Sequence, residues 1–184
     1  MTDKEIFAAI RARRGAPLLQ ADVDAVNAVL YPAGEKAPMT ISQRGIDLIK
    51  RCEGLRLSAY PDPGTGGAPW TIGYGHTGPE VRKGLTITQA QADTFLVADI
   101  QRFEADVRAL CPITTQGQFD ALVSFAYNVG QSALSGSTMR KKHVAGNYAG
   151  AAAEFDRWVY AGGRTMAGLV ARRAEERALY EGRA

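Results

Sequence analysis

The stretch that decides the fold reads Glu53-Gly-Leu-Arg-Leu-Ser-Ala-Tyr-Pro-Asp62 and resumes, after a glycine-rich segment, as Trp70-Thr-Ile-Gly-Tyr-Gly-His-Thr77. Aromatic and β-branched residues are interrupted here by Gly and Pro, with turn signals at 61–64 and 66–67. This pattern predicts a small antiparallel sheet between residues 56 and 76. Since helical periodicity dominates the rest of the chain, the expected class is α+β.

Helices are predicted on both sides of the sheet. Ser42 is placed to cap a helix whose apolar face carries Ile46, Ile49 and Cys52. The segments 88–91 and 115–118 both begin with Thr and end with Gln, which is the capping-box pattern. They predict a long helix over 88–110, linking a sheet lobe to a helical lobe, and a second helix from 115. Further helices are expected over 137–145, 148–158 and 168–181.

The first 38 residues form a separate region in this prediction. Apolar residues recur at helical spacing in two short runs between 3 and 31, and the segment 32–40 contains two prolines and a glycine, as linkers do. We therefore divide the chain into an N-terminal helical extension, residues 1–38, and a main domain, residues 39–184. The extension either packs on the main core or is a binding appendage.

Composition excludes several classes of protein. The 184 residues carry a net charge of +3, which falls short of the dense basic stripe of a dedicated nucleic-acid binder. Two cysteines, Cys52 and Cys111, cannot build a disulfide framework, and we interpret them as buried thiols. With only two histidines besides, neither a metal nor another cofactor is expected. No export signal or membrane span is visible, so we expect a cytosolic protein without membrane insertion.

Two carboxylates flank the sheet segment. Glu53 stands at the predicted end of an apolar helix, and Asp62 follows nine positions later in a turn. Burial beside apolar groups favours the neutral form of a carboxyl group, whereas a solvated turn aspartate stays ionised. Glycoside hydrolysis needs two carboxyl groups in such unlike environments. By itself the pair is a weak signal, because a surface glutamate and a turn-forming aspartate are common.

Residues 52–77 resemble the catalytic segment of phage-type, T4-like lysozymes, the endolysin family. Later blocks match in the same order over about 40–182, namely 125–130, 137–140, 158–164 and 168–173. Several blocks in order are far more specific than one motif. The resemblance implies a lysozyme-like α+β fold and a muramidase that cleaves the β-1,4 bond between N-acetylmuramic acid and N-acetylglucosamine in peptidoglycan.

The resemblance also implies catalytic roles. Glu53 corresponds to the family's general acid. Asp62 and Thr71 correspond to the residues that position the attacking water, with inversion at the anomeric carbon. The segment between Asp62 and Thr71 is longer than in the T4-like pattern. Thr65 is therefore a rival for the threonine role.

Other residues are candidates for substrate binding or support. Gly75, Tyr127, Asn128 and Ser137 are the expected substrate contacts, although core packing explains Tyr127 and a helix N-cap explains Ser137 equally well. We interpret His76 as a fold-tying histidine rather than the proton donor.

The last helix supplies two further candidates. A charged run such as 172–177 is by default a solvated face. The family resemblance instead implies that one arginine of the pair Arg172 and Arg173 holds Glu53, and we favour Arg172.

The expected biology follows from the resemblance. We expect a monomeric endolysin that accumulates in the host cytoplasm and reaches the periplasm and cell wall once a holin opens the membrane. Peptidoglycan is the expected partner, so residues 1–38 are either a cell-wall-binding helix pair or a packing element. No nucleic-acid partner is expected. Two alternatives stay open, a lytic transglycosylase and a non-catalytic wall-binding module with a lysozyme fold.

Overall fold

The computed structural model describes residues 38–61, 66–112 and 114–183. The helices predicted between 3 and 31, together with Asp62 and Thr65, lie outside these ranges. The compact unit that contains every described element begins at Met39. Its elements, in chain order, are α3 (Gln43–Glu53), β1 (Arg56–Pro61), β2 (Trp70–Gly73), α4 (Gln89–Leu110), α5 (Gln116–Val129), α6 (Gln131–Gly136), α7 (Thr138–Val144), α8 (Tyr148–Glu154), the 3-10 turn η1 (Phe155–Arg157), β3 (Tyr160–Ala161), β4 (Arg164–Thr165) and α9 (Ala167–Tyr180).

The predicted sheet is present as an antiparallel pair, β1 with β2. Tyr60 lies opposite Thr71, and the register shifts between Arg56 and Tyr60. Beyond β2 the chain turns back sharply, because Ile72 and His76 exchange two backbone hydrogen bonds of 2.9 Å. The turn contains glycines with left-handed φ, including Gly75 at 95°. This tight return fixes the backbone that follows the sheet.

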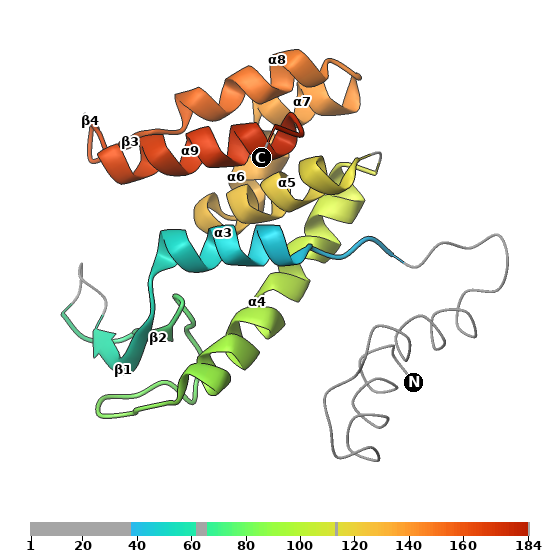
Figure 1. Cartoon of the computed structure of the whole chain (residues 1–184). Coiled ribbons are helices and arrows are strands. Elements are labelled where there is room, and N and C mark those ends of the chain that lie inside the picture. Colours follow the sequence, from blue (N-terminus) through green and yellow to red (C-terminus); the bar gives the residue numbers. More distant parts are fainter. Residues whose placement is uncertain (1–37, 62–65, 113, 184) are drawn as a thin grey trace, which may run out of the picture. The chain divides into compact units, whose positions relative to one another are not determined.

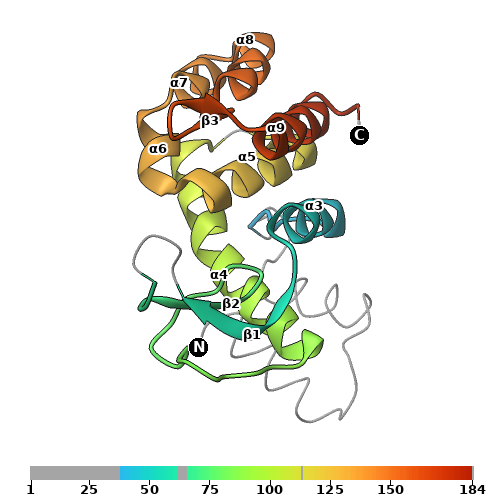
Figure 2. The same ribbon diagram turned by 90° about the vertical axis from the view of Figure 1, so that its left-hand side faces the viewer.

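Helix α4 connects the sheet to the helical lobe, as predicted. Its 22 residues correspond to a length of about 33 Å. Thr88 and Gln91 form the expected capping box at its start. The helix packs against β2 and also against α5 and α6, and Figure 2 shows it running from the sheet up to these helices.

Helix α5 is the centre of the helical lobe. All nine residues from Gln118 to Ala126 are buried, because α3, α4, α6 and α9 all pack against it. Thr115 and Gln118 form the second expected capping box. Figure 1 shows α5 beside both α3 and α9. The end of the first described helix and the last helix of the chain therefore meet over α5.

Four local features differ from the prediction. Ser42 occupies the N-cap of α3, but its hydroxyl donates to Asp120 in α5 instead of capping the helix. The helix expected over 148–158 ends at Glu154 and continues as the 3-10 turn. Helix α6 and the hairpin β3–β4 were not predicted, since such short elements carry too little periodicity to be recognised.

The chain enters the compact unit through backbone contacts to α4 and α5. Arg108 donates to the carbonyl oxygen of Met39 (2.6 Å), and Gln116 donates to that of Thr40 (2.8 Å). Glu104 accepts from the backbone N–H of Ile41 (2.7 Å). Among residues 38–61, 66–112 and 114–183, none of the helices has the combination of length and apolar character needed to span a bilayer.

Candidate functional site

Glu53 is the last residue of α3. Gly54 ends the helix with a left-handed φ of 71°, a conformation that glycine adopts without steric cost. Ile49, one turn earlier, is fully buried, so this face of the helix points into the protein. The Glu53 side chain keeps 22% of its surface exposed. It therefore stands at the boundary between the core and solvent.

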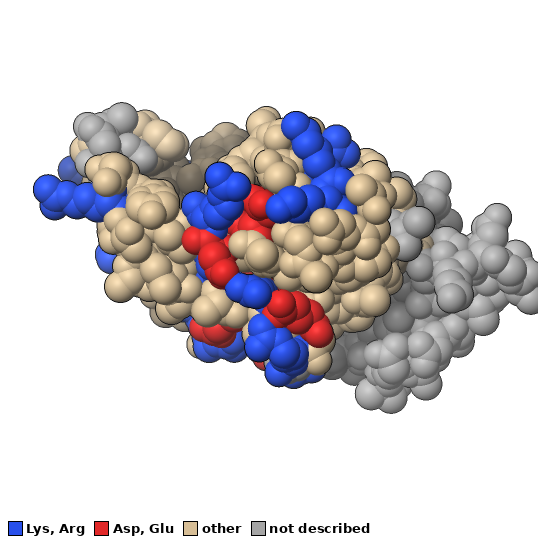
Figure 3. Space-filling view, turned by 90° about the horizontal axis from the view of Figure 1, so that it is seen from above, with Lys and Arg blue, Asp and Glu red and all other residues tan. Residues whose placement is uncertain are grey.

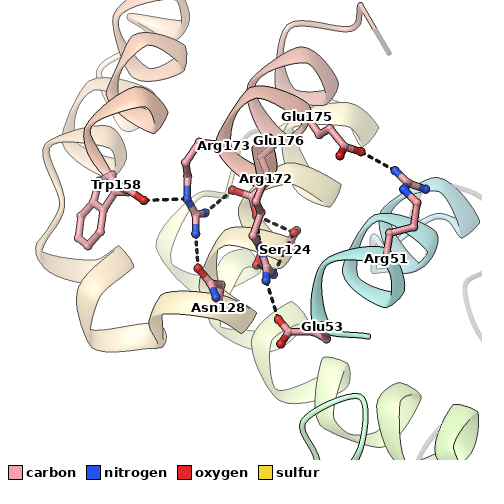
Figure 4. Close-up of polar contacts among 9 residues, drawn as sticks. All are labelled: Arg51, Glu53, Ser124, Asn128, Trp158, Arg172, Arg173, Glu175 and Glu176. Carbon is pink, nitrogen blue, oxygen red and sulfur yellow. Dashed lines mark hydrogen bonds and ion pairs between the residues drawn. The ribbon is translucent and has the colours of Figure 1, made fainter. Parts of the chain in front are cut away.

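Arg172 holds one oxygen of this carboxylate. Its Nη1 donates to Oε1 of Glu53 at 2.6 Å, while Nε donates to Oε1 of Glu176 at 3.0 Å and Nη2 to the carbonyl oxygen of Ser124 at 3.0 Å. Figure 4 shows the guanidinium between the two carboxylates. All three nitrogens are engaged, so the plane of the guanidinium is fixed. The structure thus selects Arg172, the favoured arginine, as the contact of Glu53.

Arg173 points elsewhere in the same cluster. It donates to Glu176, to Oδ1 of Asn128 and, from Nε, to the carbonyl oxygen of Trp158 at 3.2 Å. Its guanidinium also lies over the ring of Phe125, 4.9 Å from the centroid. Arg173 therefore does not contact Glu53 directly and instead connects Glu176 to the exposed end of α5, as Figure 4 shows.

The buried charges shift one another's pKa. Burial acts to lower the pKa of Arg172, but the carboxylates of Glu176 and Glu53 outweigh it and raise that pKa. Burial lowers the pKa of Arg173. Burial raises the pKa of Glu176, and the two guanidinium groups oppose this shift. The cluster is thus a group of mutually dependent charges rather than a set of independent pairs.

The second oxygen of Glu53 faces a backbone without a side chain. A Cβ atom placed on Gly75 would lie 3.8 Å from Oε2 of Glu53. Gly75 is exposed, and its φ of 95° is unfavourable for other residues. The glycine therefore leaves open the space beside the oxygen that Arg172 does not hold.

Tyr127 and Asn128 lie at the end of α5. The hydroxyl of Tyr127 donates to the carbonyl oxygen of Tyr74 at 2.9 Å, next to Gly75 in the chain. Burial raises the pKa of Tyr127, so its hydroxyl stays protonated and keeps donating. Asn128 is exposed, and its side-chain oxygen accepts from Arg173. Both residues are thus tied to the backbone or the charges around Glu53.

The remaining catalytic candidates are placed less completely. Thr71 is half-buried in β2, opposite Tyr60. Asp62 follows the last residue of β1 in the sequence. Both Asp62 and Thr65 lie outside the described residues. The roles of Asp62, Thr65 and Thr71 therefore stay predictions.

His76 is a cross-link within the fold. Its Nδ1 lies 2.8 Å from Asp99 in α4, and its Nε2 lies 2.7 Å from Glu80. The ring stacks on Phe95 with centroids 4.3 Å apart. Burial acts to lower the pKa of His76, but the hydrogen bonds that its ring makes to the carboxylates of Glu80 and Asp99 raise it overall. These contacts support the interpretation of His76 as a fold-tying residue.

Ser137 caps a helix. It is 5% exposed, donates to the carbonyl oxygen of Leu134 at 2.7 Å, and accepts from the backbone N–H of Arg140 at 3.0 Å. Its hydroxyl is engaged on both sides at the start of α7. The N-cap interpretation accounts for this serine, and a contact of Ser137 with substrate stays a prediction.

Comparison with known proteins identifies the family. The sequence profile of the family described as phage lysozyme matches residues 50–176, a range that runs from α3 to α9. The chain belongs to the phage lysozyme family. This confirms the resemblance inferred from the sequence blocks, and the α+β lysozyme-like fold agrees with it.

Individual relatives of this phage lysozyme are similar over most of its length. It is 50% identical over 143 residues to the endolysin of Bacillus phage PZA, covering 77% of this chain and 55% of that protein. It is 45% identical over 148 residues to the endolysin of Acyrthosiphon pisum secondary endosymbiont phage 1, covering 78% and 99%. The chain thus spans about half the length of the first of these relatives.

A solved structure gives the same result for the fold. The muramidase domain of SpmX from Asticaccaulis excentricus superposes with a TM-score of 0.70 at 38% identity. The superposition covers 77% of this chain and 97% of that domain.

Sequence analysis missed two members of the site, Glu176 and Ser124. The run 172–177 does not form the solvated face expected by default, because Arg172, Arg173 and Glu176 are all buried. The signal was present as spacing, since Glu176 stands four residues after Arg172 and three after Arg173. Among the described residues, no group of three or more His, Cys, Asp or Glu side chains is arranged to hold a metal ion.

Proposed function

We propose that this phage lysozyme is an endolysin that hydrolyses the β-1,4 bond between N-acetylmuramic acid and N-acetylglucosamine in peptidoglycan. The observation that carries the proposal is the asymmetry of Glu53. One oxygen is held by Arg172 at 2.6 Å, and the other faces the open space at Gly75. A general acid needs this arrangement, with a fixed carboxyl group that presents one free oxygen to the substrate.

The two carboxylates then divide the chemistry. Glu53 gives a proton from Oε2 to the oxygen of the leaving sugar. Asp62 and Thr71 orient a water molecule on the opposite face of the sugar ring. The water oxygen bonds to the anomeric carbon as the glycosidic bond breaks, Asp62 accepts the proton that the water loses, and the anomeric configuration is inverted. The position of Asp62 directly after β1, and of Thr71 in the paired strand β2, supports this pairing of roles. No cofactor takes part in the reaction.

The sugar chain contacts Gly75, Tyr127 and Asn128. An aromatic ring and an amide suit a ligand that has apolar faces and many hydroxyl groups. The net charge of +3 gives a weak general attraction to an anionic wall. Figure 3 shows basic and acidic side chains interleaved over the middle of one face rather than a single basic patch. Contacts to the sugars, and not charge alone, therefore determine binding.

Access to the wall completes the proposal. The protein is a monomer made in the host cytoplasm, and it reaches the periplasm and peptidoglycan when a holin opens the membrane. Residues 1–38 form an N-terminal extension to the catalytic domain 39–184. Deletion of the extension tests its role: lost wall binding at an unchanged melting temperature indicates a targeting element, and a lowered melting temperature indicates a packing element.

Mass spectrometry of digested peptidoglycan tests the reaction. Hydrolysis gives products with a reducing-end muramic acid, which is the expected result. Products ending in 1,6-anhydromuramic acid would show a lytic transglycosylase instead, and wall binding without released fragments would show a non-catalytic module. Proton NMR of the first product distinguishes inversion, with an initial α-anomer, from retention.

A further inference from the structure

A buried carboxylate lies behind the proposed general acid. Glu176 in α9 has no exposed surface, yet it accepts three hydrogen bonds. Its Oε1 accepts from Nε of Arg172 at 3.0 Å and from the hydroxyl of Ser124 at 2.7 Å, and its Oε2 accepts from Arg173. Two of these donors also contact each other, because Ser124 Oγ accepts from Nη2 of Arg172 at 3.5 Å. Burying a charged group costs desolvation free energy, which only well-placed partners and further hydrogen bonds offset.

The charges of this cluster balance only with Glu176 included. Two guanidinium groups, Arg172 and Arg173, face two carboxylates, Glu53 and Glu176. The cluster is neutral when Glu53 is ionised and carries one positive charge when Glu53 holds a proton. Without the charge of Glu176, the net charge of the cluster is +1 when Glu53 is ionised and +2 when Glu53 holds a proton. Loss of Glu176 therefore favours the ionised form of Glu53, which is the form that cannot act as an acid.

Other groups near the cluster do not replace Glu176. From α3 the thiol of Cys52 faces it, and from α5 the phenol of Tyr127 and the hydroxyl of Ser124 do. Burial raises the pKa of Cys52 and that of Tyr127, so both side chains stay uncharged at neutral pH. Across these described neighbours, Glu176 is the group that compensates the second arginine.

We propose that Glu176 is a positioning residue of this enzyme. Its carboxylate fixes the plane of Arg172 so that Nη1 meets Glu53, and its negative charge offsets one of the two positive charges beside the proton donor. The proposal rests on the proposed function, since it assigns Glu53 the role of general acid.

The variant Glu176→Gln tests the charge. Glutamine has the same shape but no charge, so Arg172 keeps Glu53 as its one carboxylate partner. We expect the basic limb of the pH profile of kcat/KM to move down by about one pH unit, with KM unchanged. Glu176→Asp tests the position, because it keeps the charge on a shorter side chain. We expect the basic limb to stay at the wild-type pH while kcat falls about tenfold.

Glu154→Gln is the matched control. Glu154 is also buried, 6% exposed, and pairs with Lys142 at 2.5 Å in a different part of the helical lobe. Its neutralisation removes a buried charge of the same kind. We expect a lower melting temperature but a wild-type pH profile. A purely structural role for Glu176 would make Glu176→Gln behave in the same way as this control.

The outcomes separate the possibilities. A Glu176→Gln profile whose basic limb coincides with that of wild type overturns the proposal. If Glu176→Gln does not fold, Glu176→Asp decides: a kcat equal to wild type, or a change confined to KM, overturns the proposal. Rates are measured as release of reducing-end muramic acid. Wild-type protein that releases none defeats the proposed function itself, and the role of Glu176 falls with it.

Discussion

Replacement of Arg172 by glutamine should destabilise the protein strongly. Arg172 is 4% exposed and has hydrogen bonds to Glu53, Glu176 and Ser124. Removal of one partner of a buried ion pair costs about 3–5 kcal/mol, because the remaining charge is left uncompensated. Glu176 keeps its contacts with Arg173 and Ser124, and the Glu53 side chain, which is 22% exposed, can be hydrated instead. We therefore expect a cost of about 3 kcal/mol, at the lower end of this range. For a domain of this size that corresponds to a fall in Tm of about 10 °C.

Differential scanning calorimetry of Arg172→Gln beside Arg172→Lys measures this effect. Lysine keeps the charge but lacks the planar fork, so it cannot reach both carboxylates and the Ser124 carbonyl together. We expect an intermediate Tm for lysine, and activity much below wild type for both variants because Glu53 is no longer fixed. A Tm for Arg172→Gln within about 2 °C of wild type would refute the reasoning, since no buried charge would then depend on Arg172.

Three further predictions concern the rest of the molecule. The pKa of His76 is raised in the folded state by its carboxylate partners, so its stabilising effect is present below about pH 6.5 and is lost as pH rises through the folded pKa. Thermal melts should therefore show a larger loss of Tm for His76→Gln at pH 5.5 than at pH 8.5, and an equal loss would contradict this. Gly75→Ala should lower kcat/KM about tenfold or more, whereas Gly84→Ala, which also has a left-handed φ (82°) but no neighbour within 4 Å, should keep wild-type kinetics in the same assay. Because burial raises the pKa of Cys111 to about 11, this thiol should react with Ellman's reagent at pH 8 only after denaturation, and rapid native reaction would show that it is accessible.

Local signals in the sequence predicted local structure well. The capping boxes at Thr88 and Thr115 mark the starts of α4 and α5 correctly, because a capping box involves only residues within one turn. Ser42 shows the limit of such reasoning. It stands at the N-cap, but Asp120, 78 residues away, takes its hydroxyl. Which partner a polar side chain chooses depends on tertiary packing that spacing alone does not contain.

The contact between Glu53 and Arg172 could be anticipated from the sequence, whereas the buried residues behind it could not. The family resemblance placed Glu53 and favoured Arg172, and the ion pair between them is present at 2.6 Å. The burial of Glu176 was missed, because charged runs at helical spacing are usually solvated. The packing of α9 against α5, and also against α3, places this part of the run in the core. A run of charges thus becomes a buried network for reasons that lie in another helix.

The hairpin β3–β4 was missed for a different reason. Its strands contain two residues each, too few for the alternation that indicates a strand. The turn residues Gly162 and Gly163 both have left-handed φ, 56° and 74°, as in the tight turns that favour two glycines. The glycine pair was the available signal, and it predicts a turn without revealing that the flanking residues pair.

The rate at which Glu53→Gln releases reducing-end muramic acid from purified peptidoglycan tests the central claim most directly. Glutamine keeps the shape of Glu53 but cannot donate the proton, so we expect a rate at least about a hundredfold below wild type at an unchanged fold. Glu175→Gln is the matched control, because Glu175 is an exposed carboxylate paired with Arg51 at 2.7 Å, and it should keep the wild-type rate. Release by Glu53→Gln at a rate close to wild type would contradict the assignment of Glu53 as the general acid.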